Sequence, residues 1–193
     1  MPELVLASTS PHRRALLERL GLPFAVEPPG VDETPGPGER PRELVRRLAL
    51  AKARAVARRR PGALVIGSDQ VAELDGRPLG KPGGREAAVD QLLALSGRRV
   101  VFHTGLALVG PGEREEAEVV PYAVRFRPLR REQAEAYLAR EPEACGCAGA
   151  FRSEGLGIAL VEGFEGEDPT ALVGLPLVRL VTLLEAAGLP VLA

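Results

Sequence analysis

The chain has 193 residues, of which 45% are hydrophobic and 26% are charged, and its formal net charge is −1 at pH 7. This composition supplies enough apolar side chains for a real core and excludes a disordered or fibrous protein. Acidic and basic residues are interspersed, and the apolar runs are much shorter than a membrane span. We therefore expect a cytoplasmic protein with no stable nucleic-acid partner and no membrane partner.

The first third of the chain alternates strand-like and helix-like patterns. A short apolar run at residues 3–7 predicts a buried strand, and Ser10 followed by Pro11 is typical of a helix N-terminus. That helix is expected to end at Gly21. Next we expect a strand, a loop rich in Pro and Gly and a long amphipathic helix, at residues 24–26, 27–41 and 41–60.

The remainder begins with a strongly apolar run at residues 64–68, which predicts a central strand with Asp69 at its C-terminal end. Residues 71–74 continue this strand into a hairpin turned by Asp75 and Gly76. The other expected elements are helices at 85–95, 130–140 and 175–187, long strands at 99–109 and 115–126, and a strand-like segment at 157–161.

These patterns together predict an α/β fold. The alternation of strands and helices at the start indicates parallel βαβ units, whereas the two long neighbouring strands indicate an antiparallel portion. We expect a mixed, twisted sheet with flanking helices. The whole chain, residues 1–193, then forms one domain with two lobes around a central cleft.

Lysine is rare here compared with arginine, because Lys52 and Lys81 stand against 23 arginines. An ammonium group is a compact point charge that fits between phosphate oxygens, and a planar guanidinium cannot always replace it. The two lysines are therefore candidate phosphate ligands. Chance survival during a drift toward arginine is the other explanation.

The segment from Ser8 to Arg14 is a candidate anion site. It brings three hydroxyl groups to the start of a helix, where backbone N–H groups favour an anion. Arg13 and Arg14 in the first turn oppose the helix dipole, and a bound phosphate would offset that cost. A well-capped helix with solvated arginines is the alternative.

Two acidic residues are candidate metal ligands: Glu33 in the Pro/Gly-rich loop and Asp69 after the central strand. Ligands of α/β sheets gather at the carboxyl ends of strands. Paired carboxylates near phosphates suit Mg²⁺ or Mn²⁺, and either carboxylate could orient an attacking water. Taken singly, each could also be an ordinary loop or turn residue.

Other polar features carry weaker signals. Lys81 lies in a Gly-Lys-Pro-Gly-Gly segment that lacks the Walker A pattern, and Glu154 lies between glycines that would let a ligand approach. Both segments could be plain turns. Cys145 and Cys147 have the wrong spacing for a zinc site, and we take them as small residues near a turn; His103 is taken as structural.

Eight segments, in order, resemble the Maf family of nucleoside triphosphate pyrophosphatases, which shares a fold with the inosine triphosphatase group. They are LASTSPHRRALLERLG, VDET, AKA, IGSDQV, GRPLGKP, SGRRVVFHTGLALV, CAGAFRSEGLGIALVE and DPTALVGLPL. FRSEGLGIALVE with IGSDQV is most similar to the branch associated with 7-methyl-GTP. That branch can carry tryptophan where this chain has His12.

The resemblance implies that water attacks the α-phosphorus of a nucleoside triphosphate and releases pyrophosphate, with Mg²⁺ or Mn²⁺ as cofactor. It implies a homodimer as well. Asp69 matches the proton acceptor, and Glu33 and Asp69 match acids near the metal. The matched triphosphate ligands are Ser8, Arg13, Lys52 and Lys81, and the matched positions for base choice are His12, Gln70 and Glu154.

Two alternatives stay open from the sequence. One is the dTTP and UTP activity of the other Maf branch. The other is a non-catalytic nucleotide-binding regulator of cell division and septum formation. The near-neutral net charge argues against tight DNA binding by such a regulator, but not against nucleotide binding.

Overall fold

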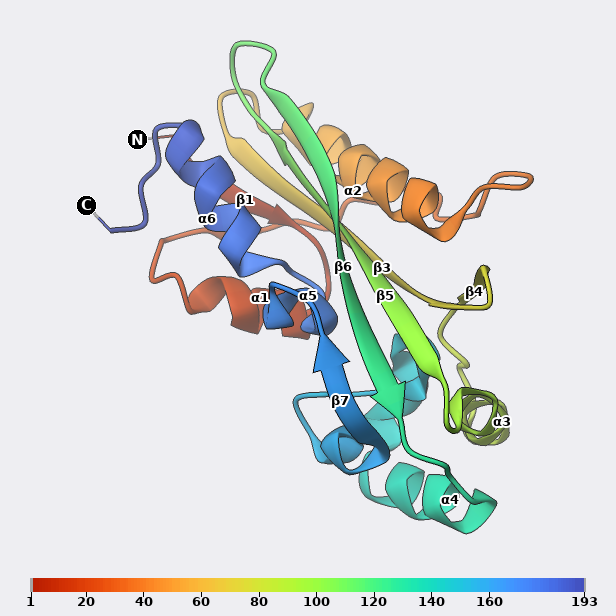
Figure 1. The fold of residues 1–193 in the computed structure, drawn as a ribbon. Coiled ribbons are helices and arrows are strands. Elements are labelled where there is room, and N and C mark those ends of the chain that lie inside the picture. The colour runs from red at the N-terminus through yellow and green to blue at the C-terminus, as the bar shows by residue number, and fades with distance from the viewer. Residues whose placement is uncertain (1, 193) are drawn as a thin grey trace.

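The computed structural model describes residues 2–192 and has one mixed sheet with helices packed around it (Figure 1). The strands are β1 (Leu4–Ala7), β2 (Ala25–Val26), β3 (Leu64–Leu74), β4 (Arg77–Leu79), β5 (Arg99–Val109), β6 (Glu115–Phe126) and β7 (Val161–Glu165). The α-helices are α1 (Pro11–Glu18), α2 (Pro41–Ala57), α3 (Arg85–Leu95), α4 (Arg131–Arg140), α5 (Pro169–Val173) and α6 (Leu177–Ala186).

The strand order is β2-β1-β3-β5-β6-β7, with β4 also paired to β3. β1 runs parallel to β2 and β3, and the other neighbours are antiparallel. The predicted mixed sheet, with parallel pairing at the start and antiparallel pairing in the middle, is therefore confirmed. β3 is central because apolar side chains from both of its faces are buried, including Leu64, Val65 and Ile66.

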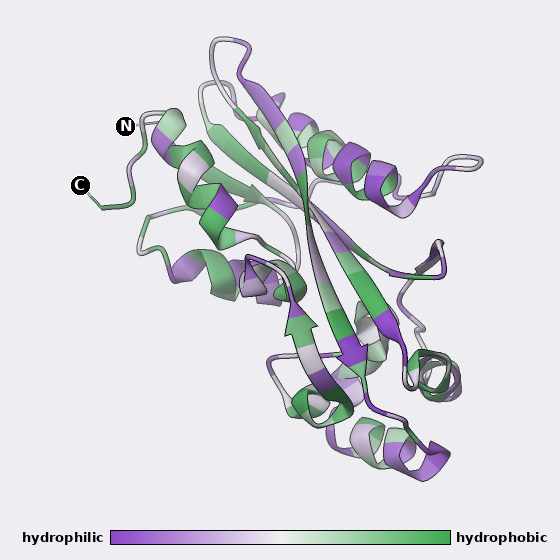
Figure 2. Ribbon diagram, in the orientation of Figure 1, coloured by the Kyte–Doolittle hydropathy of each residue, from purple (hydrophilic) through white to green (hydrophobic). Residues whose placement is uncertain are grey.

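The core is divided between the two ends of the sheet. At one end, α1 and α6 cover one face through leucines such as Leu17 and Leu180, and α2 covers the other through Ala49, Ala53 and Val56. At the other end, α3 and α4 pack on the far parts of β5 and β6. Figure 2 shows hydrophobic residues along the central strands and hydrophilic residues over much of the outward side of α2.

Two sequence-based expectations about elements were wrong. Residues 157–161 do not form a strand: Leu156–Leu160 is a 3-10 helix, and β7 begins only at Val161. The apolar pattern there reflects one-sided packing of a tight helix on the core, as Gly157 and Leu160 are buried. The last helix begins at Leu177, and the short helix α5 before it was not expected.

Two further 3-10 helices, Pro142–Gly146 and Ala148–Ala150, connect α4 to the segment before β7. Across residues 2–192, no helix combines the length and the apolar character that a bilayer crossing requires. The 3-10 helices matter for the site described next, because they form one of its walls.

Candidate active site

A cleft of about 1050 Å³ lies where the two ends of the molecule meet. Its walls come from the β1–α1 segment, the segment before α2, α2 itself, the centre of β3, the β4–α3 segment and the 3-10 helices. The cleft brings together side chains that the sequence separates widely: Ser8, His12, Arg13, Glu33, Lys52, Asp69, Gln70 and Lys81 all line it.

The pairing of β3 explains why the cleft opens at this place. β1 ends opposite Gly67, and the antiparallel β4 ends opposite Ala72 on the same edge of β3, while β5 pairs continuously along the other edge. Within the described residues, the stretch from Ser68 to Val71 therefore has no strand neighbour on that edge. Asp69 lies in this gap, in the middle of β3 and not at its end as the sequence suggested.

Close packing of α2 on the sheet brings a lysine to Asp69. A Cβ atom added at Gly67 would lie 2.1 Å from the carbonyl oxygen of Ala49, so only glycine permits this approach. Lys52 follows Ala49 by about one helical turn and is 4% exposed. Its Nζ lies 2.6 Å from Asp69 Oδ1.

The Lys52 ammonium also contacts Glu33, at 2.8 Å from Oε1. The two carboxylates thus converge on one point, although Glu33 retains a 58% exposed side chain and that of Asp69 is only 11% exposed. A buried ammonium needs such partners, because an unpaired buried charge is very costly.

The same two carboxylates fit a hard divalent cation only in part. Among the described residues, no group of three or more His, Cys, Asp or Glu side chains could hold a metal. Magnesium retains several waters and is often held by one or two carboxylates together with substrate phosphates. Glu33 and Asp69 suit that mode of binding, in which the phosphates supply the remaining oxygens.

The start of α1 has the expected cap. Ser10 Oγ accepts a hydrogen bond from the backbone N–H of Arg13, and Ser8 is 4% exposed with its Oγ accepting from Ser10 N–H at 3.1 Å. Arg14 turns to the surface and pairs with Glu18. Arg13 is the basic residue that faces the cleft.

The Arg13 guanidinium is held by a distant turn. Its Nε donates to the Gly174 carbonyl oxygen at 2.9 Å, and the Ser68 hydroxyl donates to the same oxygen at 2.8 Å. Burial lowers the pKa of Arg13 from its ordinary value, while the charges of Asp69 and Glu33 act in the opposite direction. The guanidinium is thus fixed within the field of both acids.

Asp168 supports that turn, and its role was not predicted. It is 1% exposed, and its carboxylate accepts hydrogen bonds from the backbone N–H groups of Thr170 at 3.0 Å and Val178 at 2.9 Å. One side chain therefore caps both α5 and the start of α6. The Asp168-Pro169 pair was the sequence signal, since aspartate before proline is typical of a helix N-terminus.

An acidic cluster adjoins the cleft beside Glu143; Glu143 itself lines the cleft, whereas Glu154, the predicted base-choice residue, is not among the residues that line it. His12 Nδ1, on α1, lies 3.3 Å from Glu154 Oε1, in the segment between two of the 3-10 helices, so two residues matched to base choice meet here. Arg152 holds Glu154 at 3.4 Å, and also contacts Glu141 at 2.9 Å and Glu143 at 2.7 Å. One guanidinium faces three carboxylates here.

Gln70, the third residue matched to base choice, uses its side-chain amide within the protein. Its Nε2 donates to the carbonyl oxygens of Ala171 at 2.7 Å and Leu172 at 3.0 Å, and to the Thr104 hydroxyl at 3.0 Å. These contacts tie α5 to the sheet. A role of Gln70 in base choice stays a prediction.

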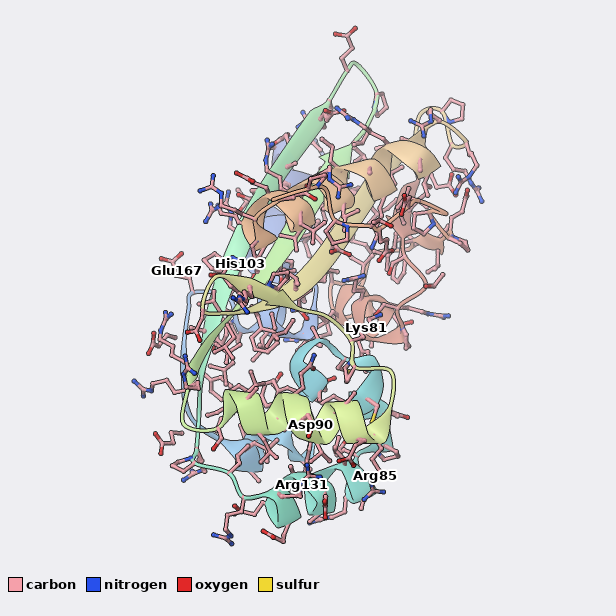
Figure 3. All side chains as sticks on the ribbon, turned by 90° about the vertical axis from the view of Figure 1, so that its right-hand side faces the viewer. Lys81, Arg85, Asp90, His103, Arg131 and Glu167 are labelled. Atoms are coloured by element: carbon pink, nitrogen blue, oxygen red, sulfur yellow. The ribbon has the colours of Figure 1, made fainter. Side chains whose placement is uncertain are left out.

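Lys81 lies on the exposed segment that leads from β4 to α3 (Figure 3). Cys147 also lines the cleft, which its spacing from Cys145 in the sequence did not indicate. Burial raises the pKa of the Cys147 thiol. His103, by contrast, lies on β5, where its Nε2 is 2.8 Å from Glu73 Oε2.

Comparison with known proteins shows the family. The family model described as "Maf-like protein" matches residues 3–187. A protein of Nitrosococcus oceani named 7-methyl-GTP pyrophosphatase is 57% identical over 99% of this chain and 96% of its own length. A protein of the same name from Methylobacillus flagellatus is 52% identical over the full length of both chains.

Among solved structures, the Ham1 protein of Staphylococcus aureus has a TM-score of 0.48 and 21% identity, covering 64% of this chain and 71% of that one. This chain belongs to the Maf family.

Proposed function

We propose that this protein is a nucleoside triphosphate pyrophosphatase that hydrolyses 7-methyl-GTP to the monophosphate and pyrophosphate. The observation that carries the proposal is the convergence of Asp69, Lys52 and Glu33, with Lys81 and Arg13, on a single cleft of about 1050 Å³. The names of the close relatives support the same activity.

The cations of the cleft, together with a divalent metal ion, can offset the charge of a triphosphate. A triphosphate carries about four negative charges, and phosphoryl-transfer enzymes offset them with positioned cations. Arg13, Lys52 and Lys81 supply three positive charges from three different segments. Negative charge grows on the pyrophosphate as it leaves, so the same groups stabilise the transition state more than the bound substrate.

Glu33 and Asp69 are the residues that would hold a Mg²⁺ or Mn²⁺ ion together with phosphate oxygens. When bound, the ion supplies positive charge that offsets the phosphates and polarises them toward attack. The Lys52 ammonium lies at the same point of the cleft, so its N–H groups could donate to phosphate oxygens as well as to the two acids.

Asp69 is the proton acceptor of the proposed reaction. Its carboxylate takes a proton from a water molecule whose oxygen forms a bond to the α-phosphorus. The bond between the α-phosphorus and the bridging oxygen of the β-phosphate breaks, and pyrophosphate leaves. Asp69 suits this role because β3 fixes it rigidly while the strand gap leaves its edge open to the cleft.

The acidic end of the cleft favours a base that carries positive charge. The 7-methylguanine ring is cationic, and the cluster beside the cleft sets the carboxylates of Glu154, Glu141 and Glu143 against Arg152 and the nearby ammonium of Lys81. A carboxylate is also an acceptor for the N–H donors at the edge of guanine. The His12 imidazole, paired with Glu154, offers a smaller stacking surface than the tryptophan of the resembled branch.

The test is a panel of triphosphates with Mg²⁺ or Mn²⁺, in which pyrophosphate and orthophosphate are measured separately. We expect pyrophosphate, with 7-methyl-GTP as the best substrate and with GTP, dTTP and UTP as comparisons. Orthophosphate as the product would refute cleavage at the α-phosphorus. A regulator of cell division would keep its cellular effect in an Asp69→Asn variant that no longer hydrolyses any triphosphate.

A further inference from the structure

The loop that carries Glu33 has no regular structure of its own. Residues 27–40, all of which the structure describes, form neither helix nor strand and include several prolines and glycines. Glu33 is nevertheless placed within 2.8 Å of Lys52. Ordering the backbone of a loop costs conformational entropy, so other contacts must hold this loop in place.

Arginines of α2 and its C-terminal turn provide those contacts. At the start of the loop, Glu27 accepts hydrogen bonds from Arg59 at 2.6 Å and Arg60 at 2.7 Å. At the other end, the Arg47 fork contacts both carboxylate oxygens of Glu39, through Nε at 2.6 Å and Nη2 at 2.8 Å. The loop is thus anchored along the same helix that carries Lys52.

Arg47 reaches further than its ion pair. Its Nη2 also donates to the carbonyl oxygen of Thr34 at 3.1 Å, and Thr34 directly follows Glu33. Glu39, held by Arg47, accepts from the Gly36 N–H at 2.9 Å. Two points of the loop next to Glu33 are therefore tied to one guanidinium, whose five donors form a rigid fork.

We propose that Arg47 is a positioning residue that holds the loop so that the Glu33 carboxylate reaches Lys52 and the proposed metal and phosphate groups. We call the contacts of Arg47 with Thr34 and Glu39 the tether. What Glu33 binds in this inference rests on the proposed function, whereas the tether does not depend on it. The hydrogen bonds from Arg47 lower the pKa of Glu39 to about 2, so the ion pair is intact at neutral pH.

The chain offers a matched control in the neighbouring residue. Arg46 is also exposed on α2, but its Nε donates to the Ala117 carbonyl oxygen on β6, away from the loop. Arg46→Ala removes the same charge from the same helix without untying Glu33. Arg47→Lys keeps the charge and loses the fork, so it should recover only part of the function.

The first readout is hydrogen–deuterium exchange of the loop amides at Thr34 and Gly36, which donate to Asp32 and Glu39, without metal or substrate. We expect faster exchange in Arg47→Ala and no change in Arg46→Ala, at equal melting temperatures. Unchanged exchange in Arg47→Ala, or equal acceleration in both variants, would overturn the tether. This readout does not require catalysis.

The second readout is kinetic. Loss of a group that orients a metal ligand typically costs about 10–100-fold, so kcat/KM for 7-methyl-GTP should fall by about that factor in Arg47→Ala. The divalent cation concentration needed for half-maximal rate should rise, and Arg47→Lys should lie between Arg47→Ala and the natural protein. Faster exchange with unchanged kinetics would refute the positioning role. If the natural protein released no pyrophosphate, the proposed function would fail, and exchange alone would decide the tether.

Discussion

The two ends of the cleft are built in different ways. Most of the phosphate end is made by regular elements, the β1–α1 junction, the middle of β3 and the face of α2, and only Glu33 and Lys81 come to it from irregular segments. The base end is made by 3-10 helices and the segment around Glu154, held by Arg152 and its three carboxylates. The difference suggests that the reaction is fixed by the rigid end and the choice of base by the loop-built end.

If this division holds, variants at the phosphate end slow hydrolysis of every triphosphate alike. Variants at the base end should instead change the ratio between substrates. The predictions below test that division, beginning with the largest expected effect.

Asp69→Asn should lower kcat by about 10²–10⁴-fold on all triphosphates, because it removes the proton acceptor. The fold should survive, since the amide can still accept from Lys52. Pyrophosphate release measures the effect. Asp75→Asn is the control, because Asp75 lies on the same hairpin and pairs with Arg98 at the surface. Near-normal activity of Asp69→Asn would remove Asp69 from the mechanism.

Lys52→Met should lower kcat/KM by about 10²–10³-fold, again for all triphosphates, in analogy with loss of one stabilising donor. It also leaves Asp69 buried without its cation, so the melting temperature should fall. Arg54→Met serves as the control on the same helix, because Arg54 pairs with the exposed Glu115. A loss confined to 7-methyl-GTP would contradict the assignment of Lys52 to the phosphate end.

Glu154→Gln should act on selectivity. A hydrogen bond to a charged group is worth about 1.5–3 kcal/mol, so the preference for 7-methyl-GTP over GTP should fall by about tenfold or more. Hydrolysis of dTTP should change much less. Ratios of kcat/KM measure this, with the exposed Glu162→Gln on β7 as the control. An equal loss on every substrate would place Glu154 in the phosphate machinery.

The smallest effect concerns Tyr137. Its hydroxyl accepts a hydrogen bond from the backbone N–H of Arg152 at 3.1 Å, next to the base end of the cleft. Burial raises the pKa of Tyr137 from 10.0 to about 12. The neutral phenol is therefore favoured by the fold, so its contribution to stability is complete below pH 10 and is lost as the pH rises through 12.

Tyrosinate absorbance during an alkaline titration measures this shift, and Tyr137→Phe assigns it. The same variant should lower the free energy of unfolding by about 1 kcal/mol, because the Arg152 N–H loses its partner. A titration of Tyr137 near pH 10 would show that the segment around Arg152 is open to solvent.

The phosphate end was largely predictable from the sequence, and the base end was not. Ser10 with Pro11 marked the start of α1, and the apolar run before Asp69 marked β3, because caps and buried strands have local signatures. The rarity of lysine singled out Lys52 and Lys81, and both line the cleft. The gap in the pairing of β3 could not be read from sequence, since it depends on where β1 and β4 end.

At the base end, tertiary packing overrode the local pattern. The apolar residues 157–161 suggested a strand but form a 3-10 helix for all but the last residue. Arg152 was not singled out, because one arginine among 23 carries no local signal of contact with three acids. The glycines around Glu154 and the resemblance to the Maf family both singled out Glu154, and only the structure paired it with His12.

The most direct test of the central claim is hydrolysis of 7-methyl-GTP in heavy-oxygen water, with mass analysis of both products. Attack at the α-phosphorus puts the labelled oxygen on the monophosphate, and the pyrophosphate stays unlabelled. Label in pyrophosphate, or release of labelled orthophosphate, would contradict the account, because the water prepared by Asp69 would then have reached a different phosphorus.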